Sequence, residues 1–306
     1  MSGVVPLATK DFAVGPSYGW GSELKGSAMQ LVETVAALRE ARGRYARLGL
    51  VPTMGYLHEG HLSLVRRAKQ ECGAVAVSIF VNPTQFGPGE DFARYPRSLQ
   101  RDLELLDGVQ TDLVFAPGAD EIYPAGHATA IEVGGVTDVL EGAVRPGHFR
   151  GVATVVGKLF NMVQPTRAYF GQKDAQQTVV IKKMVRDLDM PLEVVVCPTV
   201  REPNGLAMSS RNSYLAADER QAATVLYRAL GAADARFKAG ERSGEALRGV
   251  MRETLSTEAR AGIDYVSVAD RSSLRELDTV PPEGALASMA VQIGKTRLID
   301  NLFLEN

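Results

Sequence analysis

Two of the four histidines in this chain of 306 residues, His58 and His61, lie three positions apart. Residues at this spacing share one face of a helix, so their imidazoles are expected to point the same way. An apolar run at 48–51 precedes them and a helical pattern follows, which indicates a turn between a buried strand and a helix. Such turns in open α/β sheets bind ligands, and the helix amides there favour anions. The pair therefore predicts a site that handles phosphate.

Two alternatives remain open for these histidines. They could simply cap the helix, although the glycines beside them, Gly55 and Gly60, favour a ligand that approaches the backbone closely. They could also bind zinc, but no cysteine or third histidine stands nearby in the sequence to complete a zinc site.

Polar residues follow two further apolar runs. Asn82 and Gln85 come after 74–81 and offer neutral donors and acceptors for the hydroxyl and carboxylate oxygens of a small substrate. An Asn-Pro turn with a solvated glutamine explains them equally well. Lys173 opens a helix, where the helix dipole disfavours a cation unless an anion binds there. The alternative is a solvated lysine beside an ordinary first-turn residue, Asp174.

Two loops could add to such a site. Ser209, Ser210 and Arg211 combine hydroxyls with a guanidinium, which suits phosphate, although a polar linker would look the same. The loop at 140–152 contains Arg145, His148 and Arg150. It could form a pocket wall or an anion site, and an ordinary solvated loop is an equal alternative.

The composition limits the class of protein. Apolar residues make up 45% of the chain and charged residues 23%, as in a globular protein. The net charge of −2 gives no general attraction to nucleic acid or to an anionic membrane. Cys72 and Cys197 lie in unrelated contexts, which favours a reduced, cytoplasmic protein. No apolar run reaches the length of a transmembrane span.

The rhythm of the sequence predicts an α/β protein whose residues 29–199 form a Rossmann-like, doubly wound parallel sheet. Runs rich in valine, isoleucine and phenylalanine fit strands that are buried on both faces. Strands are expected at 48–51, 74–81, 112–115, 168–170 and 192–197. Helices are expected at 29–43, 60–72, 98–107, 151–163 and 174–187. The sequence contains neither the glycine fingerprint of dinucleotide sites nor a Walker A motif.

The pattern changes near residue 200, and residues 200–306 are expected to form a smaller C-terminal α+β domain. Its helices are expected at 216–239 and 243–256, and its strands at 263–269, 285–293 and 296–302. Residues 1–28 lack periodicity and are expected to be a leader that need not be ordered, either a natural extension or partly a cloning remnant. Met29 is then a candidate start.

Together these segments resemble the pantothenate synthetases, or pantoate–β-alanine ligases, over about residues 29–302. The matching signatures are at 51–55 with 57–61, 78–86, 145–152, 170–174 with 176 and 177, and 208–212. The histidine motif alone would indicate only the wider nucleotidylyl-transferase superfamily, whereas five signatures in order are far more specific. The resemblance implies that ATP drives the condensation of (R)-pantoate with β-alanine through a pantoyl adenylate. Pantothenate, a precursor of coenzyme A, would form with release of AMP and pyrophosphate.

The resemblance also implies a role for each matching position. His61 would act as proton donor, His58 and Lys173 would lie beside the phosphates, and Arg211 would close over them from the hinge. Gln85 and Gln177 would hold pantoate. Gln85 would also lie where β-alanine arrives, and Asn82 would be a further pocket residue. The implied ATP site consists of Met54, Gly55, Tyr56, Leu57, His58, Glu59, Gly60, His61, Gly171, Gln172, Lys173, Asp174, Val200, Met208, Ser209, Ser210 and Arg211.

Mg²⁺ would accompany ATP, and Asp102 is the expected neighbour of the metal. Two positions depart from the family pattern: Arg101 stands where many relatives are acidic, and Gln172 stands where glutamate is frequent. The resemblance further implies a homodimer formed through the larger domain. The expected partners are the small-molecule substrates, without nucleic acid or membrane.

Other functions are kept as alternatives. A plain nucleotidyltransferase would need no β-alanine and would be expected to have a cationic substrate pocket, against which Gln85 and Gln177 argue. A catalytically silent nucleotide-binding or regulatory module would be expected to have lost His61 or Lys173, and both are present. A nucleic-acid role, suggested by a distant likeness to class I tRNA synthetases, lacks a basic surface excess.

Overall fold

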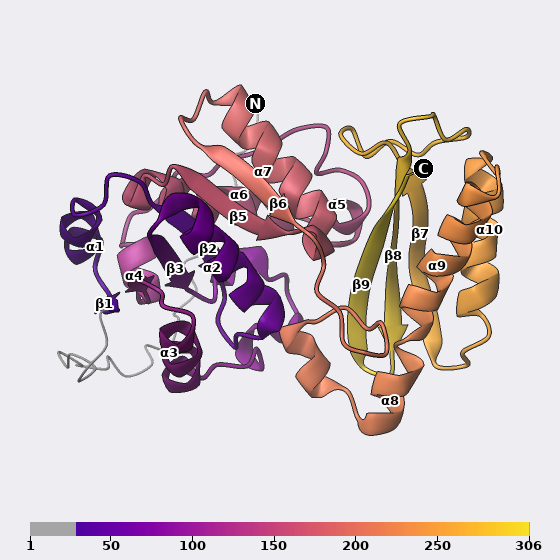
Figure 1. The fold of residues 1–306 in the computed structure, drawn as a ribbon, viewed down its shortest axis with the longest axis horizontal. Coiled ribbons are helices and arrows are strands. Elements are labelled where there is room, and N and C mark those ends of the chain that lie inside the picture. The colour runs from indigo at the N-terminus through magenta and orange to yellow at the C-terminus, as the bar shows by residue number, and fades with distance from the viewer. Residues whose placement is uncertain (1–28, 306) are drawn as a thin grey trace, which may run out of the picture.

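The computed structural model describes residues 29–305 and contains two sheets that lie side by side (Figure 1). The larger sheet is parallel, with the strand order β1-β4-β3-β2-β5-β6. Its strands are β1 (Gln30–Val32), β2 (Gly49–Thr53), β3 (Val75–Ile79), β4 (Leu113–Phe115), β5 (Arg167–Gly171) and β6 (Glu193–Cys197). Strand order reverses between β2 and β5. The carboxyl ends of these two strands therefore flank the switch point, where ligands of doubly wound sheets bind.

Helices cover both faces of this sheet because neighbouring residues of its strands point to opposite sides. Leu50 packs into a core with α1, α6 and α7, whereas Val51 packs into a second core with α2 and α3. The helices are α1 (Val35–Arg42), α2 (Glu59–Cys72), α3 (Leu99–Gly108), α6 (His148–Val163) and α7 (Ala175–Asp187), with the short α4 (Ala119–Ile122) and α5 (Glu141–Val144). The doubly wound parallel sheet predicted from the sequence is confirmed.

The smaller sheet is antiparallel, with the strand order β7-β8-β9, and it packs against α9 and α10 around a core of its own (Figure 1). These elements are α8 (Ala217–Ala222), α9 (Val225–Lys238), α10 (Gly244–Leu255), β7 (Ala261–Ala269), β8 (Ala285–Ile293) and β9 (Thr296–Leu304). The α+β character predicted for the C-terminal region is confirmed. None of the helices within residues 29–305 combines the length and apolar character needed to cross a membrane.

Two predicted helices differ from the structure. The prediction at 29–43 is wrong at its start, because Gln30–Val32 is an edge strand that pairs with β4. The helix begins only after Thr34, whose side chain accepts a hydrogen bond from the Ala37 amide. The predicted helix at 216–239 is two helices, α8 and α9. The predicted leader at 1–28 lies outside the described residues.

Candidate functional site

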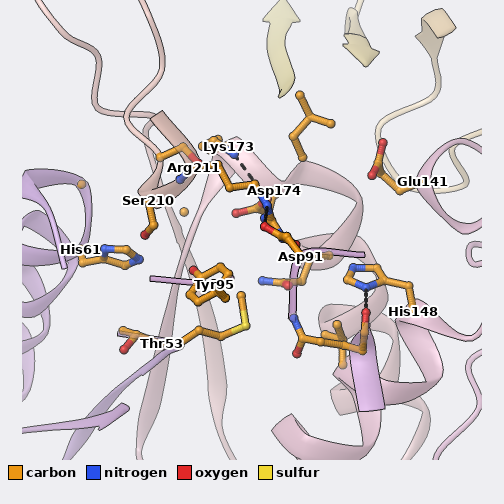
Figure 2. Close-up of a pocket in the computed structure, with 18 of the residues that line it drawn as sticks. Thr53, His61, Asp91, Tyr95, Glu141, His148, Lys173, Asp174, Ser210 and Arg211 are labelled. Carbon is orange, nitrogen blue, oxygen red and sulfur yellow. Dashed lines mark hydrogen bonds and ion pairs between the residues drawn. The ribbon is translucent and has the colours of Figure 1, made fainter. Parts of the chain in front are cut away.

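A cavity of about 700 Å³ lies at the carboxyl ends of β2 and β5 and extends to the edge of the smaller sheet (Figure 2). Segments far apart in the sequence line it together, as predicted from the motifs that follow β2, β3 and β5. The predicted site residues that line it are Met54, His58, Gly60, His61, Asn82, Gln85, Gly171, Lys173, Asp174, Gln177, Val200, Met208, Ser209, Ser210 and Arg211.

Six predicted site residues do not line the cavity. They are Gly55, Tyr56, Leu57, Glu59, Gln172 and Asp102. Leu57 is a core residue with 1% exposure, and Glu59 forms an exposed ion pair with Arg66. The Gln172 side chain contacts Asn301 instead of facing the cavity. A contiguous motif also contains residues that shape the turn, and these six positions lie outside the lining that the other predicted residues share.

Asp102, the predicted neighbour of the magnesium ion, contacts the backbone of the turn after β2. Its two carboxylate oxygens each accept a backbone amide, from Tyr56 and from Leu57, at 2.7 Å. Its side chain is 1% exposed, and a Cβ added at Gly55, where φ is +80°, would lie 3.0 Å from its Oδ2. Burial raises the pKa of Asp102, against the lowering effect of these amides. These contacts give the carboxylate a structural role, because it holds the turn after β2 in shape.

The two histidines form one unit at the start of α2. The His58 amide donates to Nδ1 of His61 at 3.3 Å, and the ring centroids lie 4.0 Å apart. Because Nδ1 of His61 is an acceptor, its Nε2 carries the proton in the neutral ring. Burial, followed by the charges of His58 and Lys173, holds the pKa of His61 well below its usual range. His61 is therefore a neutral imidazole that can donate from Nε2.

His58 is held against the backbone. A Cβ added at Gly60 would lie 2.9 Å from the His58 ring, so this glycine leaves room for the ring as well as for a ligand. Burial, followed by the charge of Lys173, lowers the pKa of His58 to about 4. Its Nδ1 is buried and has no hydrogen-bond partner among the described residues.

Two of the cations that line the cavity, Lys173 and Arg211, come from segments far apart in the sequence (Figure 2). Lys173 lies just after β5, and its Nζ is 3.7 Å from the Asp174 carboxylate. Arg211 donates to both carboxylate oxygens of Asp91, at 2.8 and 2.9 Å. Ser209 accepts the Arg211 amide and thereby fixes the turn that carries the guanidinium. The sequence did not single out Asp91, although a guanidinium with low exposure requires an acidic partner.

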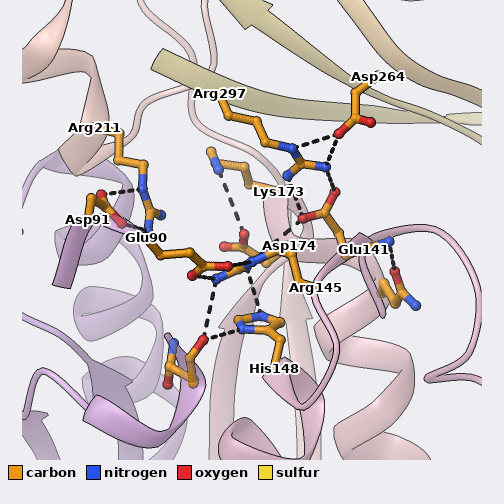
Figure 3. A network of polar contacts seen from close by, with 12 residues as sticks. Glu90, Asp91, Glu141, Arg145, His148, Lys173, Asp174, Arg211, Asp264 and Arg297 are labelled. Carbon is orange, nitrogen blue, oxygen red and sulfur yellow. Dashed lines mark hydrogen bonds and ion pairs between the residues drawn. The ribbon is translucent and has the colours of Figure 1, made fainter. Parts of the chain in front are cut away.

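A second chain of charges joins the smaller sheet to α5 and its neighbouring segments across the cavity (Figure 3). Arg145 pairs with Glu90 at 2.7 Å, and its Nη1 lies 4.0 Å from Glu141. Arg297 of β9 also donates to Glu141, at 2.7 and 2.8 Å, and pairs with Asp264 of β7. Of these residues, sequence reasoning had singled out only Arg145, because ion pairs between distant segments leave no local signature.

The segment 140–152, predicted as a loop, contains α5 and the start of α6, and it contributes part of the cavity wall. Arg145 and His148 line the cavity, whereas Arg150 is half-exposed and pairs with Glu132. Nη1 of Arg145 lies 3.1 Å from Nε2 of His148. Because a guanidinium can only donate, Nδ1 of His148 carries the proton and donates to the Gln85 carbonyl at 2.8 Å. Burial, followed by the charge of Arg145, lowers the pKa of His148 to about 4.

We expect the free energy of unfolding to fall as pH falls from 6.5 towards 4. His58 and His148 have folded pKa values of about 4, below their ordinary value of 6.5. In that window the unfolded chain binds protons that the folded chain does not, so acid favours unfolding. Urea unfolding at about pH 7 and about pH 5 measures this loss. The loss should shrink in His148→Asn and change little in His127→Asn, at a less buried ring. An equal loss in wild type and His148→Asn would contradict the assignment.

The zinc alternative gains no support within residues 29–305. No three side chains among the histidines, cysteines and acidic residues described there are grouped so that they could hold a metal ion. His58 and His61 instead face a cavity that contains lysine and arginine, which suits an anion.

Comparison with known proteins gives matches along nearly all of the described residues. A family model described as pantoate-beta-alanine ligase matches residues 29–303. A pantothenate synthetase of Chloroflexus aggregans is 65% identical over 276 residues, covering 90% of this chain and 100% of the relative. That of Moorella thermoacetica is 56% identical over 281 residues, covering 90% and 99%.

Solved structures agree with these matches. A pantothenate synthetase from Thermus thermophilus superposes with a TM-score of 0.88 at 50% identity, covering 91% of this chain and 100% of that one. A pantoate-beta-alanine ligase from Francisella tularensis, in complex with beta-gamma ATP and β-alanine, has a TM-score of 0.74 at 35% identity, with coverages of 91% and 98%. Sequence and fold therefore match the same proteins.

Proposed function

Because the chain belongs to the pantoate–β-alanine ligase family, whose members make pantothenate, we propose that its cavity activates (R)-pantoate with ATP. The pantoate carboxylate oxygen attacks the α-phosphorus and the bond to the β-phosphate breaks, which gives pantoyl adenylate and pyrophosphate. The amine of β-alanine then attacks the acyl carbon. The bond to AMP breaks, AMP leaves and the amine loses a proton.

One observation carries this proposal: cations and a neutral donor from three segments meet in one cavity beside two uncharged glutamines. Lys173, Arg211 and His61 face the space that Gln85 and Gln177 also line. The cations would neutralise charge that develops on the phosphates, which is how sites without a protein nucleophile accelerate such transfers. The glutamines would hold pantoate through neutral hydrogen bonds. An arginine would bind the pantoate carboxylate more strongly in the ground state and lower its nucleophilicity.

We assign the catalytic roles accordingly. His61 donates from Nε2 to a phosphate oxygen, and His58 lies beside it. Lys173 and Arg211 contact the phosphates. The remaining ATP contacts are assigned to the cavity-lining members of the predicted set: Met54, Gly60, Gly171, Asp174, Val200, Met208, Ser209 and Ser210. The structure of the relative from Francisella tularensis is a complex with beta-gamma ATP and β-alanine, which supports the proposal that this chain binds ATP and β-alanine.

Mg²⁺ would enter with ATP. The residues described include no cluster of three protein ligands, which fits a metal held mainly by phosphate oxygens and water. The Asp174 carboxylate lines the cavity beside Lys173 and would hold the ion from the protein side. The ion would supply further neutralisation of phosphate charge.

AMP formation tests the proposal. With ATP, Mg²⁺ and pantoate, we expect repeated turnover to AMP only when β-alanine is present. Without β-alanine, pantoate should still support exchange of labelled pyrophosphate into ATP, because adenylate formation is reversible. Formation of ADP, or AMP turnover independent of pantoate, would contradict the pathway. Sustained pyrophosphate release without β-alanine would instead favour a plain nucleotidyltransferase.

The organisation of the chain completes the proposal. We propose that residues 29–199 form the ATP- and pantoate-binding domain and that residues 200–306 form a lid domain that contributes Arg211. We further propose a cytoplasmic homodimer that associates through the larger domain, as the family resemblance implies.

A further inference from the structure

We propose that Tyr123, outside the cavity, is a positioning residue for pantoate: through Asn82 it holds the Gln85 side chain with its amide nitrogen towards the substrate. The inference rests on the proposed function, in which Gln85 binds pantoate. Tyr123 ends α4, and it is not among the residues that line the cavity. Its role is therefore to orient another side chain, without touching the substrate.

The side-chain amide of Asn82 can have only one orientation. Its Nδ2 lies 3.2 Å from the Gly151 carbonyl, which can only accept, and its Oδ1 lies 3.4 Å from the Thr84 amide, which can only donate. The Tyr123 hydroxyl donates to the same Oδ1 at 2.8 Å, and the Thr84 hydroxyl does so at 2.9 Å. Asn82 is 1% exposed, so a flipped amide would leave these groups unsatisfied.

The orientation of Asn82 fixes that of Gln85. Nδ2 of Asn82 lies 3.1 Å from the side chain of Gln85. Because Nδ2 is a donor, the Gln85 atom facing it must be the acceptor Oε1, and the Nε2 group is left for the cavity. That Nε2 has no hydrogen-bond partner among the described residues. Gln85 therefore offers a donor, which selects a substrate with a carboxylate or hydroxyl oxygen at this point.

The backbone of Gln85 is already fixed from the other side, so the side chain is what remains to be oriented. His148 donates to the Gln85 carbonyl at 2.8 Å. A Cβ added at Gly151 would lie 2.4 Å from the Thr84 carbonyl oxygen and 2.7 Å from the Gln85 amide, so α6 packs directly on this turn. Asn82 was predicted to be a further pocket residue. Its side-chain amide is hydrogen-bonded to protein groups, so we assign it the role of orienting Gln85.

Tyr123→Phe deletes one hydroxyl and keeps the ring. We expect the KM for pantoate to rise about 3–10-fold in pantoate-dependent pyrophosphate exchange, the size of one neutral hydrogen bond. The rise in KM should be moderate because the Thr84 hydroxyl still donates to Oδ1 of Asn82 in this variant. The KM for ATP should stay within about twofold, because the nucleotide contacts are elsewhere.

A double-mutant cycle separates orientation of Gln85 from a general structural role. Gln85→Ala by itself should weaken pantoate more than ATP. In that background, Tyr123→Phe should have almost no further effect on the KM for pantoate, because the side chain it orients is gone. A matched control is Tyr45→Phe, at another half-buried tyrosine of the same core, and it should leave both KM values unchanged.

The outcomes are distinct. A rise in the KM for pantoate in the wild-type background alone supports the inference. An equal rise in both backgrounds, or none in either, overturns it while leaving the proposed function intact. Exchange by the wild-type enzyme that does not depend on pantoate would overturn the proposed function itself, and this inference with it.

Discussion

Lys173→Ala is expected to lower pantoate-dependent pyrophosphate exchange by about 10²–10³-fold, the usual loss for one preorganised charge donor. Lys173 lines the cavity, and its Nζ lies 3.7 Å from the Asp174 carboxylate, a long ion pair. The ammonium is thus available to a phosphate at little cost in lost protein contacts. Initial rates of exchange, measured with saturating ATP and pantoate, give the loss directly.

The loss should come from the site and not from the fold. Lys182→Ala, at an exposed position of α7, the helix that follows Lys173, removes the same group outside the cavity and should keep wild-type exchange. Both variants should unfold at similar temperatures. Near-normal exchange in Lys173→Ala would refute the assignment of this lysine to the phosphates.

His61→Ala should cause the second large loss, again about 10²–10³-fold in exchange. Nδ1 of His61 accepts the His58 amide, so only Nε2 can donate into the cavity. Glutamine places its amide near the position of Nε2, whereas asparagine places it near Nδ1. His61→Gln should therefore retain more activity than His61→Asn, which should resemble His61→Ala. Exchange rates of the three variants, measured side by side, check this order.

The protonation state gives this prediction a second readout. The pKa of His61 is held well below 6.5, so the ring stays neutral at pH 6 and should contribute no acid limb to the exchange rate there. Equal activity of His61→Gln and His61→Asn would show that donation from Nε2 is not what His61 supplies.

The sequence predicted the centre of the fold better than its edge. Strands β2, β3 and β5 are buried on both faces and bounded by turn residues, so their apolar runs are unambiguous. The edge strand β1 has three residues, and Leu31 falls at helical spacing from Val35. Local spacing cannot distinguish the two structures there, because pairing with β4 decides the outcome.

In the site, too, features set by nearby residues could be predicted from the sequence, and contacts between distant segments could not. Motifs that follow a strand could be placed at the carboxyl edge of the sheet from the sequence alone. The direction of individual side chains could not, and Asp102 is the clearest case, since its partners are two backbone amides far away in sequence. The pair Asp91 and Arg211 was missed because it joins segments 120 positions apart.

The strand order has a consequence for how this enzyme becomes active during folding. β2 and β5 are neighbours in the sheet, with Gly49 paired to Arg167, although β3, β4 and several helices are synthesised between them. Pairings between such distant segments form late and slowly, because a long loop must close first. His61 and Lys173 flank this pairing on its two sides. A chain in which only β2, β3 and β4 have paired therefore has His61 in place without Lys173. We expect activity to appear only after β5 has paired with β2.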